Sequence, residues 1–244
     1  MTPTVLVTGA RGGIGRALCA QLHAQGWQIA AVSRDAAGLA DVPAALHIQA
    51  DCSTPDGATD ALRQCREALG VPTRLAHCVG STLIAPLHRS RADQVREVLR
   101  VNLESALFTL GAWVDVMREP AQPGAAVLVS SVVAGIGVAN HEAIAAAKGG
   151  IEALVRSAAA TYAPQGLRVN AVAPGMTDTP MTAAMLKQPA MREGAGKQYP
   201  LGGVQTADQV AGVIAWLLSD AADRLTGQVL PVDGGFTRIR PLVR

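Results

Sequence analysis

A glycine-rich turn near the start of the chain has the composition of an anion-binding loop. An apolar run over residues 5–8 leads into Thr-Gly-Ala-Arg-Gly-Gly-Ile-Gly over residues 8–15, where a predicted helix begins. Glycine permits a tight turn and lets the backbone approach a pyrophosphate, while the positive end of the following helix favours negative charge. Because the turn follows a strand and opens a helix, it predicts a dinucleotide site. The expected contacts are Gly9, Arg11, Gly13, Ile14 and Gly15.

The end of the second predicted strand indicates which dinucleotide binds. NAD-binding sites usually place an acidic residue here for the ribose 2′-hydroxyl, whereas this chain has Ser33 followed by Arg34. The guanidinium of Arg34 suits a 2′-phosphate, and Arg11 in the glycine loop adds a second positive charge. Asp35 argues the other way, and a merely solvated Arg34 would leave NAD(H) as the alternative. We therefore expect NADP(H) rather than NAD(H).

Short β-branched runs alternate with longer amphipathic stretches, and these elements must position the loop. The expected strands cover residues 5–8, 28–33, 46–50, 75–79, 126–130, 168–173 and 228–232. The expected helices cover residues 14–25, 56–69, 91–117, 142–163 and 206–219. This alternation predicts an α/β fold with a Rossmann-type, doubly wound parallel sheet of about seven strands and helices on both faces. A length of 244 residues fits a single domain, 1–244.

One long segment, residues 176–203, interrupts the alternation. It is rich in methionine and contains Pro180, Pro189 and Pro200. An insertion beyond the carboxyl end of a strand usually covers a ligand crevice, so we expect a substrate lid. Methionine suits a flexible apolar pocket such as one for an acyl chain, although ordinary helix packing explains it equally well.

Composition and charge exclude several classes of partner. The net charge is +2 without a basic block, and no apolar run reaches the length of a membrane span, so we expect neither nucleic acid nor membrane as a partner. The apolar strand starts without a basic region before it, which argues against a signal peptide. The four cysteines contain no C-x-x-C pair and fit free thiols in a reducing cytoplasm.

Further motifs follow the glycine loop in a fixed order. They are Asp51 after the third strand, Gly80 after the fourth, Asn102 in Val-Asn-Leu, Ser131 in Val-Ser-Ser, Lys148, and Pro174-Gly175 followed by Met176-Thr177. Together with residues 8–15, this series resembles the short-chain dehydrogenases/reductases over roughly residues 3–236. Overall the chain looks most like the 3-oxoacyl-acyl-carrier-protein reductases of that family.

The resemblance implies roles for these residues. It assigns Asp51 to the adenine, and Gly80 and Lys148 to the cofactor. It assigns Pro174, Gly175 and Thr177 to the lining of the nicotinamide site. It also implies a catalytic group made of Asn102, Ser131 and Lys148.

The catalytic helix departs from the family pattern at one position. The family motif is Tyr-x-x-x-Lys, with the tyrosine thirteen residues after the serine, and here Ile144 stands at that position. Reducing a ketone leaves charge on oxygen, and the family's tyrosine hydroxyl supplies the proton while a lysine one helical turn later lowers its pKa. Isoleucine has no proton to donate. Loss of a general acid costs about 10²–10⁴ in rate.

Two other side chains are candidate proton donors. His141 lies three residues before Ile144 and carries an imidazole, which titrates near neutrality. Tyr199 belongs to the predicted lid and could swing inwards, whereas Tyr162 falls too far along the same helix as Ile144. The fourth strand also departs from the family's Asn-Asn-Ala-Gly, reading His77-Cys78-Val79-Gly80. We expect that change to remove the polar pair that braces the strand.

Three functions remain open. The first is an NADPH-dependent reductase of a carbonyl or 3-oxoacyl substrate, small or linked to an acyl carrier, with an altered proton source. The second is a catalytically silent, cofactor-binding subunit that completes an oligomer with an active paralogue. A third is a redox sensor that reports NADPH occupancy. Because the family usually forms dimers through its long helices and tetramers through the last strand, we expect a homo- or hetero-oligomer.

Overall fold

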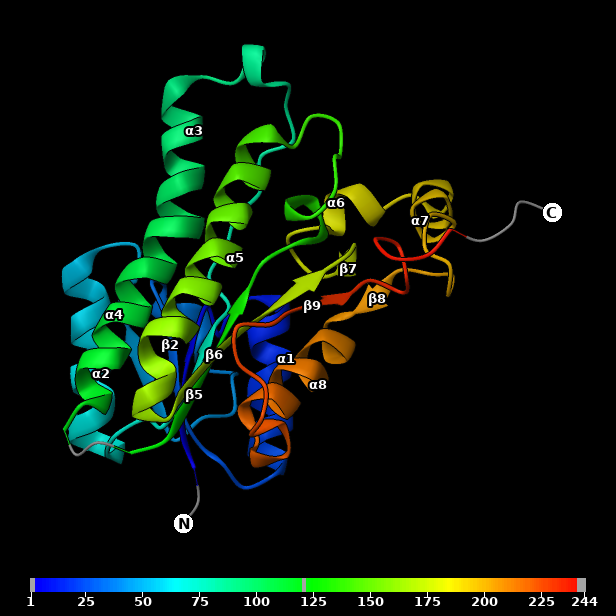
Figure 1. Ribbon diagram of the computed structural model, residues 1–244. Coiled ribbons are helices and arrows are strands. Elements are labelled where there is room, and N and C mark those ends of the chain that lie inside the picture. The colour runs from blue at the N-terminus through cyan, green and yellow to red at the C-terminus, as the bar shows by residue number, and fades with distance from the viewer. Residues whose placement is uncertain (1–2, 120–121, 241–244) are drawn as a thin grey trace.

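A seven-stranded parallel sheet forms the centre of the computed structural model, which describes residues 3–119 and 122–240 (Figure 1). The spatial order is β3-β2-β1-β4-β5-β6-β9, and every pair is parallel. The strands are β1 (Thr4–Thr8), β2 (Gln28–Ser33), β3 (Leu46–Gln49), β4 (Arg74–His77), β5 (Gly124–Val129), β6 (Leu167–Pro174) and β9 (Val229–Val232). The chain order reverses between β1 and β4, and ligands bind beyond the carboxyl ends of strands at such a switch point. The predicted doubly wound fold is confirmed.

Helices cover both faces of the sheet. On one face lie α1 (Gly13–Ala24) and α8 (Ala207–Leu218); on the other lie α2 (Pro55–Leu69), α4 (Ser105–Met117) and α5 (Glu142–Tyr162) (Figure 1). Alternation along β1 serves both cores: Val5 and Val7 pack with α1 and α8, whereas Leu6 packs with the other three helices. The first strand is therefore packed on both faces of the sheet.

The predicted long helix over residues 91–117 is interrupted by a π-turn. It consists of α3 (Ala92–Leu99), the π-helical segment η3 (Arg100–Glu104) and α4. The Ser105 N–H donates to the carbonyl oxygen of Arg100, five residues earlier, which is the π-helical bond. Such a turn is often found at a functional site. Nothing in the apolar periodicity of the sequence predicts it.

Residues 176–203 contain small elements beyond β6. They are β7 (Thr177–Asp178), α6 (Ala183–Leu186) and α7 (Pro189–Gly196), and β7 pairs in parallel with β8 (Gln205–Thr206) (Figure 1). Short 3₁₀ turns connect other elements: η1 (Ala36–Gly38), η2 (Leu87–Arg89), η4 (Val132–Ala134), η5 (Ala163–Gln165) and η6 (Asp220–Ala222). No helix within the described ranges is long and apolar enough to cross a membrane.

The strand β9 forms one edge of the sheet and contains a proline. The Ala171 N–H donates to the Gln228 carbonyl at 2.8 Å, and the Gly175 N–H donates to the Val232 carbonyl at 2.9 Å. In a parallel pair this register directs the backbone of Leu230 and Val232 towards β6. The backbone of Pro231 consequently faces the open edge.

Candidate active site

The glycine loop leaves space that a side chain would fill. Gly9 has φ of +66°, and a Cβ atom there would lie 2.6 Å from the carbonyl carbon and oxygen of Cys78. A Cβ atom on Gly15 would collide with the Gly9 carbonyl oxygen. Gly12 is the N-cap of α1, and the first turn of this helix carries no acidic side chain. The first N–H groups of a helix have no partner within it, so this loop fits the pyrophosphate of a dinucleotide.

A cleft of about 480 Å³ extends from this loop across the carboxyl ends of the central strands. Its size is within the usual range for cofactor sites, about 300–1,000 Å³. The residues that line it include six of the predicted cofactor contacts: Gly9, Arg11, Ser33, Arg34, Asp51 and Gly80. Met181, from the predicted lid, also lines the cleft.

Of the two arginines expected to offer positive charge near the end of β2, Arg11 is paired with an acidic residue and Arg34, among the residues described, is not. Arg11 forms an ion pair with Asp35, so these two predicted contributions offset each other. Asp35 also accepts a hydrogen bond from the Ala37 N–H at 3.1 Å and caps η1. Arg34 is exposed and forms no ion pair within the described part of the chain. Its guanidinium is therefore the positive charge still available to a ligand at this end.

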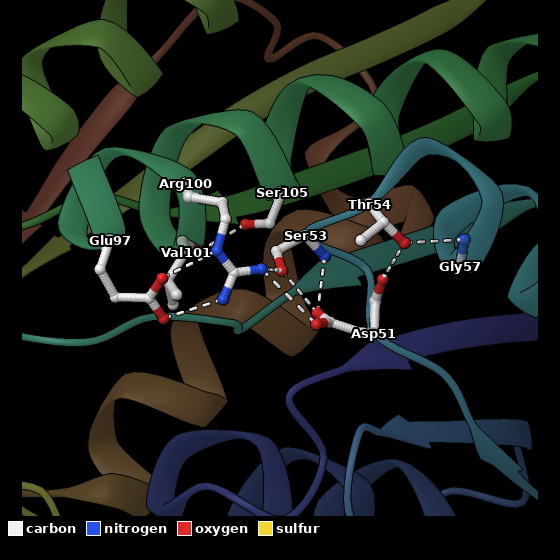
Figure 2. Close-up of polar contacts among 8 residues, drawn as sticks. All are labelled: Asp51, Ser53, Thr54, Gly57, Glu97, Arg100, Val101 and Ser105. Carbon is white, nitrogen blue, oxygen red and sulfur yellow. Dashed lines mark hydrogen bonds and ion pairs between the residues drawn. The ribbon is translucent and has the colours of Figure 1, made fainter. Parts of the chain in front are cut away.

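A network of polar contacts fixes Asp51 at the wall of the cleft (Figure 2). One carboxylate oxygen of Asp51 accepts from the Ser53 N–H at 3.0 Å and from the Ser53 hydroxyl at 2.6 Å. Its other oxygen lies 3.5 Å from Nη1 of Arg100. Burial works to raise the pKa of Asp51, but the hydrogen bonds from Ser53 and the charge of Arg100 outweigh it and lower the pKa. Asp51 therefore stays an ionised acceptor.

Lys148 and Asn102 meet beside Gly80. Lys148, on α5, is only 6% exposed, and its Nζ donates to the Val129 carbonyl at 2.8 Å. A Cβ atom on Gly80 would lie 3.4 Å from this Nζ and 3.2 Å from Oδ1 of Asn102, so a side chain at this position would be tight against Asn102 and in contact with Lys148. Burial lowers the pKa of Lys148 from 10.5 to about 8. The remaining ammonium protons suit the hydroxyls of a ribose.

Asn102 is held inside the π-turn by its own hydrogen bonds. Its Oδ1 accepts from the Ser81 N–H at 3.2 Å, and its Nδ2 donates to the Val98 carbonyl at 2.9 Å and to the Ser81 hydroxyl at 3.1 Å. The residue has no exposed surface. It therefore joins α3 to the loop that follows β4.

Ser131 and Ile144 occupy the rest of the predicted catalytic group. The Ser131 hydroxyl, just after β5, accepts from the Val133 N–H at 3.4 Å and caps η4. Ile144 lies one helical turn before Lys148 on α5 and is 4% exposed. It belongs to an apolar cluster with Val98 and Ala147, against which Leu83, Leu99, Leu103 and Val133 pack.

The two candidate proton donors lie on different elements. His141 is the N-cap of α5, and its Nδ1 donates to the Ala139 carbonyl at 2.7 Å, which leaves Nε2 unprotonated in the neutral ring. The Tyr199 hydroxyl accepts from the Met176 N–H at 2.6 Å, and burial raises the pKa of this phenol. Tyr162 is the last residue of α5, far from Ile144 along the helix.

The segment after β6 is closely packed. Pro174 ends β6, and the Thr177 hydroxyl donates to the Gly175 carbonyl at 2.9 Å. Gly175 lies against Tyr199, since a Cβ atom there would be 2.7 Å from the tyrosine ring. The first residues of the predicted lid also reach the glycine loop, because a Cβ on Gly13 would lie 2.7 Å from the Thr179 side chain. The remaining predicted contact, Ile14, lies in the first turn of α1.

Comparisons with known proteins agree with this geometry. Residues 9–237 match the family described as enoyl-(acyl carrier protein) reductase. The chain is 35% identical to the cis-4-hydroxycyclohexanecarboxylate dehydrogenase of Sinomonas cyclohexanicum, with 96% of each chain covered. It is 33% identical to the 3-oxoacyl-[acyl-carrier-protein] reductase FabG of Pseudomonas aeruginosa, covering 95% of this chain and 96% of the relative. The chain belongs to the short-chain dehydrogenase/reductase family.

Solved structures of this family share the fold. The ligand-free aldohexose dehydrogenase of Thermoplasma acidophilum superposes with a TM-score of 0.91 at 27% identity, covering 100% of this chain and 97% of that one. A short-chain type dehydrogenase/reductase from Mycobacterium ulcerans gives 0.90 at 27% identity, covering 96% and 90%. The chain is thus a short-chain dehydrogenase/reductase homologue, an oxidoreductase type that acts on hydroxyl or carbonyl groups, and its fold implies a nicotinamide cofactor.

The expected loss of polar bracing at the end of β4 is wrong for this short-chain reductase homologue. His77 is 1% exposed; its Nδ1 lies 2.9 Å from the Thr8 hydroxyl, and its Nε2 lies 3.0 Å from the Ser105 hydroxyl. Ser105 donates its proton to the Val101 carbonyl at 2.6 Å. His77 therefore donates from Nε2 to Ser105 and accepts at Nδ1 from Thr8. Burial, and next the charge of Lys148, lowers the pKa of His77 to about 3.

Three site residues escaped the sequence reasoning. Ser53 and Glu97 line the cleft with Asp51, and Arg100 contacts all three of these residues. Glu97 and Arg100 stand three residues apart on one helix face, and this spacing indicates an ion pair between them. It does not indicate the contacts of Arg100 with Ser53 and Asp51.

Proposed function

We propose that this short-chain reductase homologue is an NADP(H)-dependent oxidoreductase for a carbonyl or hydroxyl substrate, with altered proton donation at Ile144. The observation that carries the proposal is the group of Lys148, Asn102 and Gly80 beside the cleft. The lysine at the family's catalytic position and the glycine beside it, Gly80, are retained, although the residue at the tyrosine position has no hydroxyl. The resemblance to 3-oxoacyl-[acyl-carrier-protein] reductases makes 3-oxoacyl thioesters, free or linked to an acyl carrier, the first substrates to test.

The preference for NADP(H) is supported by Arg34. This exposed guanidinium lines the cleft at the end of β2, where the ribose of a bound dinucleotide lies. Arg11 contributes less charge than the sequence alone suggests, because Asp35 pairs with it. Arg34 therefore carries the preference.

Each retained side chain has a definite task in the proposed reaction. A nicotinamide cofactor, when bound, would supply the hydride chemistry at the substrate carbon. Lys148 would hold its ribose hydroxyls with the free ammonium protons, and Asn102 fixes the loop after β4. Ser131 orients the substrate oxygen, and His141 is the proposed proton donor to it. Residues 176–203 form the lid, supported by Met181 in the cleft and by Thr179 against Gly13.

The first experiment measures NADPH and NADH binding by fluorescence, followed by turnover of acetoacetyl-CoA with the preferred cofactor. Tight NADPH binding with turnover supports the proposal. His141→Gln then removes the proposed acid and should lower turnover about 10²–10⁴-fold. Tyr199→Phe, which removes the other candidate hydroxyl, should leave turnover within a few-fold. The reverse pattern would assign proton donation to Tyr199.

A second candidate function is a catalytically silent, cofactor-binding subunit. The observation that favours it is the burial of Ile144 among apolar side chains at the place of the proton donor. This hypothesis predicts NADPH binding without turnover and recovery of turnover when an active paralogue is added. Brisk turnover by the chain alone would exclude it.

Assembly and location complete the proposal. We propose a dimer or tetramer, homo- or heteromeric, to be measured by sedimentation with and without the paralogue. We place the protein in the cytoplasm, supported by its four free thiols, three of them buried.

A further inference from the structure

The first residue of the π-turn, Arg100, contacts three residues that line the cleft: Asp51, Ser53 and Glu97. The guanidinium of Arg100 contacts Glu97 through two hydrogen bonds of 2.8 Å, from Nε and from Nη2. Its Nη1 donates to the Ser53 hydroxyl and lies 3.5 Å from the Asp51 carboxylate. Figure 2 shows the guanidinium between these two sets of oxygens, which come from α3 and from the loop after β3.

The same turn carries Asn102 only two residues later. Asn102 forms hydrogen bonds with Ser81 after β4 and with the Val98 carbonyl. One short segment therefore contacts two residues that line the cleft, Ser53 through Arg100 and Ser81 through Asn102. The two contacts lie on a backbone turn with one residue more than an α-helical turn.

Side-chain anchors decide where such a turn lies. A π-turn departs from the regular ladder of helical bonds, so its position depends on contacts outside the helix. On its inner side the Val101 carbonyl accepts from Ser105, which in turn accepts from His77. The inner anchor is buried and belongs to the core. On its cleft side the anchor is Arg100, whose side chain is one-third exposed and can respond to a ligand.

We propose that Arg100 is a positioning residue that couples occupancy of the adenosine pocket to the placement of Asn102. A ligand that contacts Asp51, Ser53 and Glu97 restrains the oxygens that hold the Arg100 guanidinium. Restraining Arg100 restrains the π-turn and, with it, the bond from the Ser81 N–H to Asn102. The ligand class is an adenine nucleoside, and this inference rests on the dinucleotide cleft of the proposed function.

The test is hydrogen exchange, followed by mass spectrometry, on the full chain with adenosine as the probe. Coupling between sites commonly reaches 5–150-fold. We expect saturating adenosine to slow exchange at the Ser81 amide and in residues 102–105 at least about 5-fold in the wild type. The Arg100→Met variant is measured at the same fraction of bound adenosine as the wild type, with the adenosine concentration set from the variant's own Kd. There, adenosine should slow exchange less than about 2-fold.

A matched control separates this role from loss of an arginine in general. Arg63 on α2 also forms two ion pairs, with Asp60 and Glu67, but neither of these acidic residues lines the cleft. Arg63→Met should keep the wild-type slowing. Urea unfolding shows whether Arg100→Met is folded. If it is not, Arg100→Gln replaces it, because glutamine keeps a hydrogen-bond donor towards Ser53 without the charge. The slowing of exchange in Arg100→Gln should likewise fall below about 2-fold.

Either of two results would overturn the inference: adenosine leaves wild-type exchange unchanged, or the Arg100 variant slows as the wild type does. NADPH titration of the wild type identifies which proposal has failed. Tight NADPH binding with uncoupled exchange counts against Arg100 alone. Failure to bind NADPH counts against the proposed cofactor and the coupling together.

Discussion

Replacing Ile144 with tyrosine restores a hydroxyl one helical turn before Lys148. Ile144 is 4% exposed in its apolar cluster, so a larger ring must displace neighbours at a cost of about 1–3 kcal/mol in unfolding free energy. A positioned general acid contributes about 10²–10⁴ in rate, equal to about 2.7–5.4 kcal/mol of activation free energy. The two effects are measured separately, because one changes the urea transition and the other changes kcat.

Ile144→Phe is the matched control, since phenylalanine adds almost the same ring without the hydroxyl. Both variants should lose similar stability in urea and keep NADPH binding. In steady-state reduction of acetoacetyl-CoA by variants that also carry His141→Gln, so that the proposed native acid is absent, we expect Ile144→Tyr to exceed Ile144→Phe by about 10²–10⁴-fold. Adding Lys148→Met to Ile144→Tyr should remove most of the gain, because the ammonium lowers the pKa of the new phenol.

The reasoning is refuted if Ile144→Tyr folds, binds NADPH as Ile144→Phe does, and turns over no faster. That outcome would mean that the ring stays in the apolar cluster and does not reach the substrate. If the wild type already matches Ile144→Tyr, a different side chain supplies the proton.

Three further predictions follow from charges and buried groups. Arg34→Gln should weaken NADPH binding about 10–100-fold and change NADH binding little, because a charged hydrogen bond contributes about 1.5–3 kcal/mol; equal weakening of both would contradict the assignment. The pKa of Lys148 is about 8 in the folded chain against 10.5 ordinarily, so the unfolded chain binds more protons between these values and wild-type stability rises with pH there. Lys148→Met should therefore stabilise the cofactor-free chain by up to about 3 kcal/mol at pH 7, a gain that shrinks by pH 10 in urea titrations; a constant difference would refute this. The pKa of His77 is about 3 against 6.5, so stability is lost as pH falls below 6.5. Between pH 6.5 and 4.5, His77→Asn should lose about 2–3 kcal/mol less unfolding free energy than the wild type. Equal losses in the two proteins would contradict this prediction.

Local patterns explain why most of the fold could be predicted. Strand β2 covers residues 28–33 as expected, and α5 differs from its predicted end by one residue, because hydrophobic period and helix-ending glycines act over a few residues. The glycine loop could be predicted for the same reason. The π-turn at residues 100–104 could not, since one inserted residue per turn barely alters the apolar periodicity.

The rest of the site depends on contacts between distant parts of the chain. Arg100 and Ser53 are 47 residues apart, and His77 and Thr8 are 69 apart. Arg11 and Asp35 were both visible as charges, but only the fold brings them together as an ion pair. Residue type indicated which side chains are polar, whereas topology determined which of them meet.

Pro231 limits how the sheet can associate with other chains. An exposed edge strand is a template for a further strand, because its free N–H and carbonyl groups are ready to pair. On the open side of β9, Val229 offers an N–H but Pro231 has none, so an added strand would lose a ladder bond in the middle of a four-residue edge. Backbone pairing of a second copy at this edge is therefore disfavoured, and with it continuous sheet growth, the first step towards an aggregate.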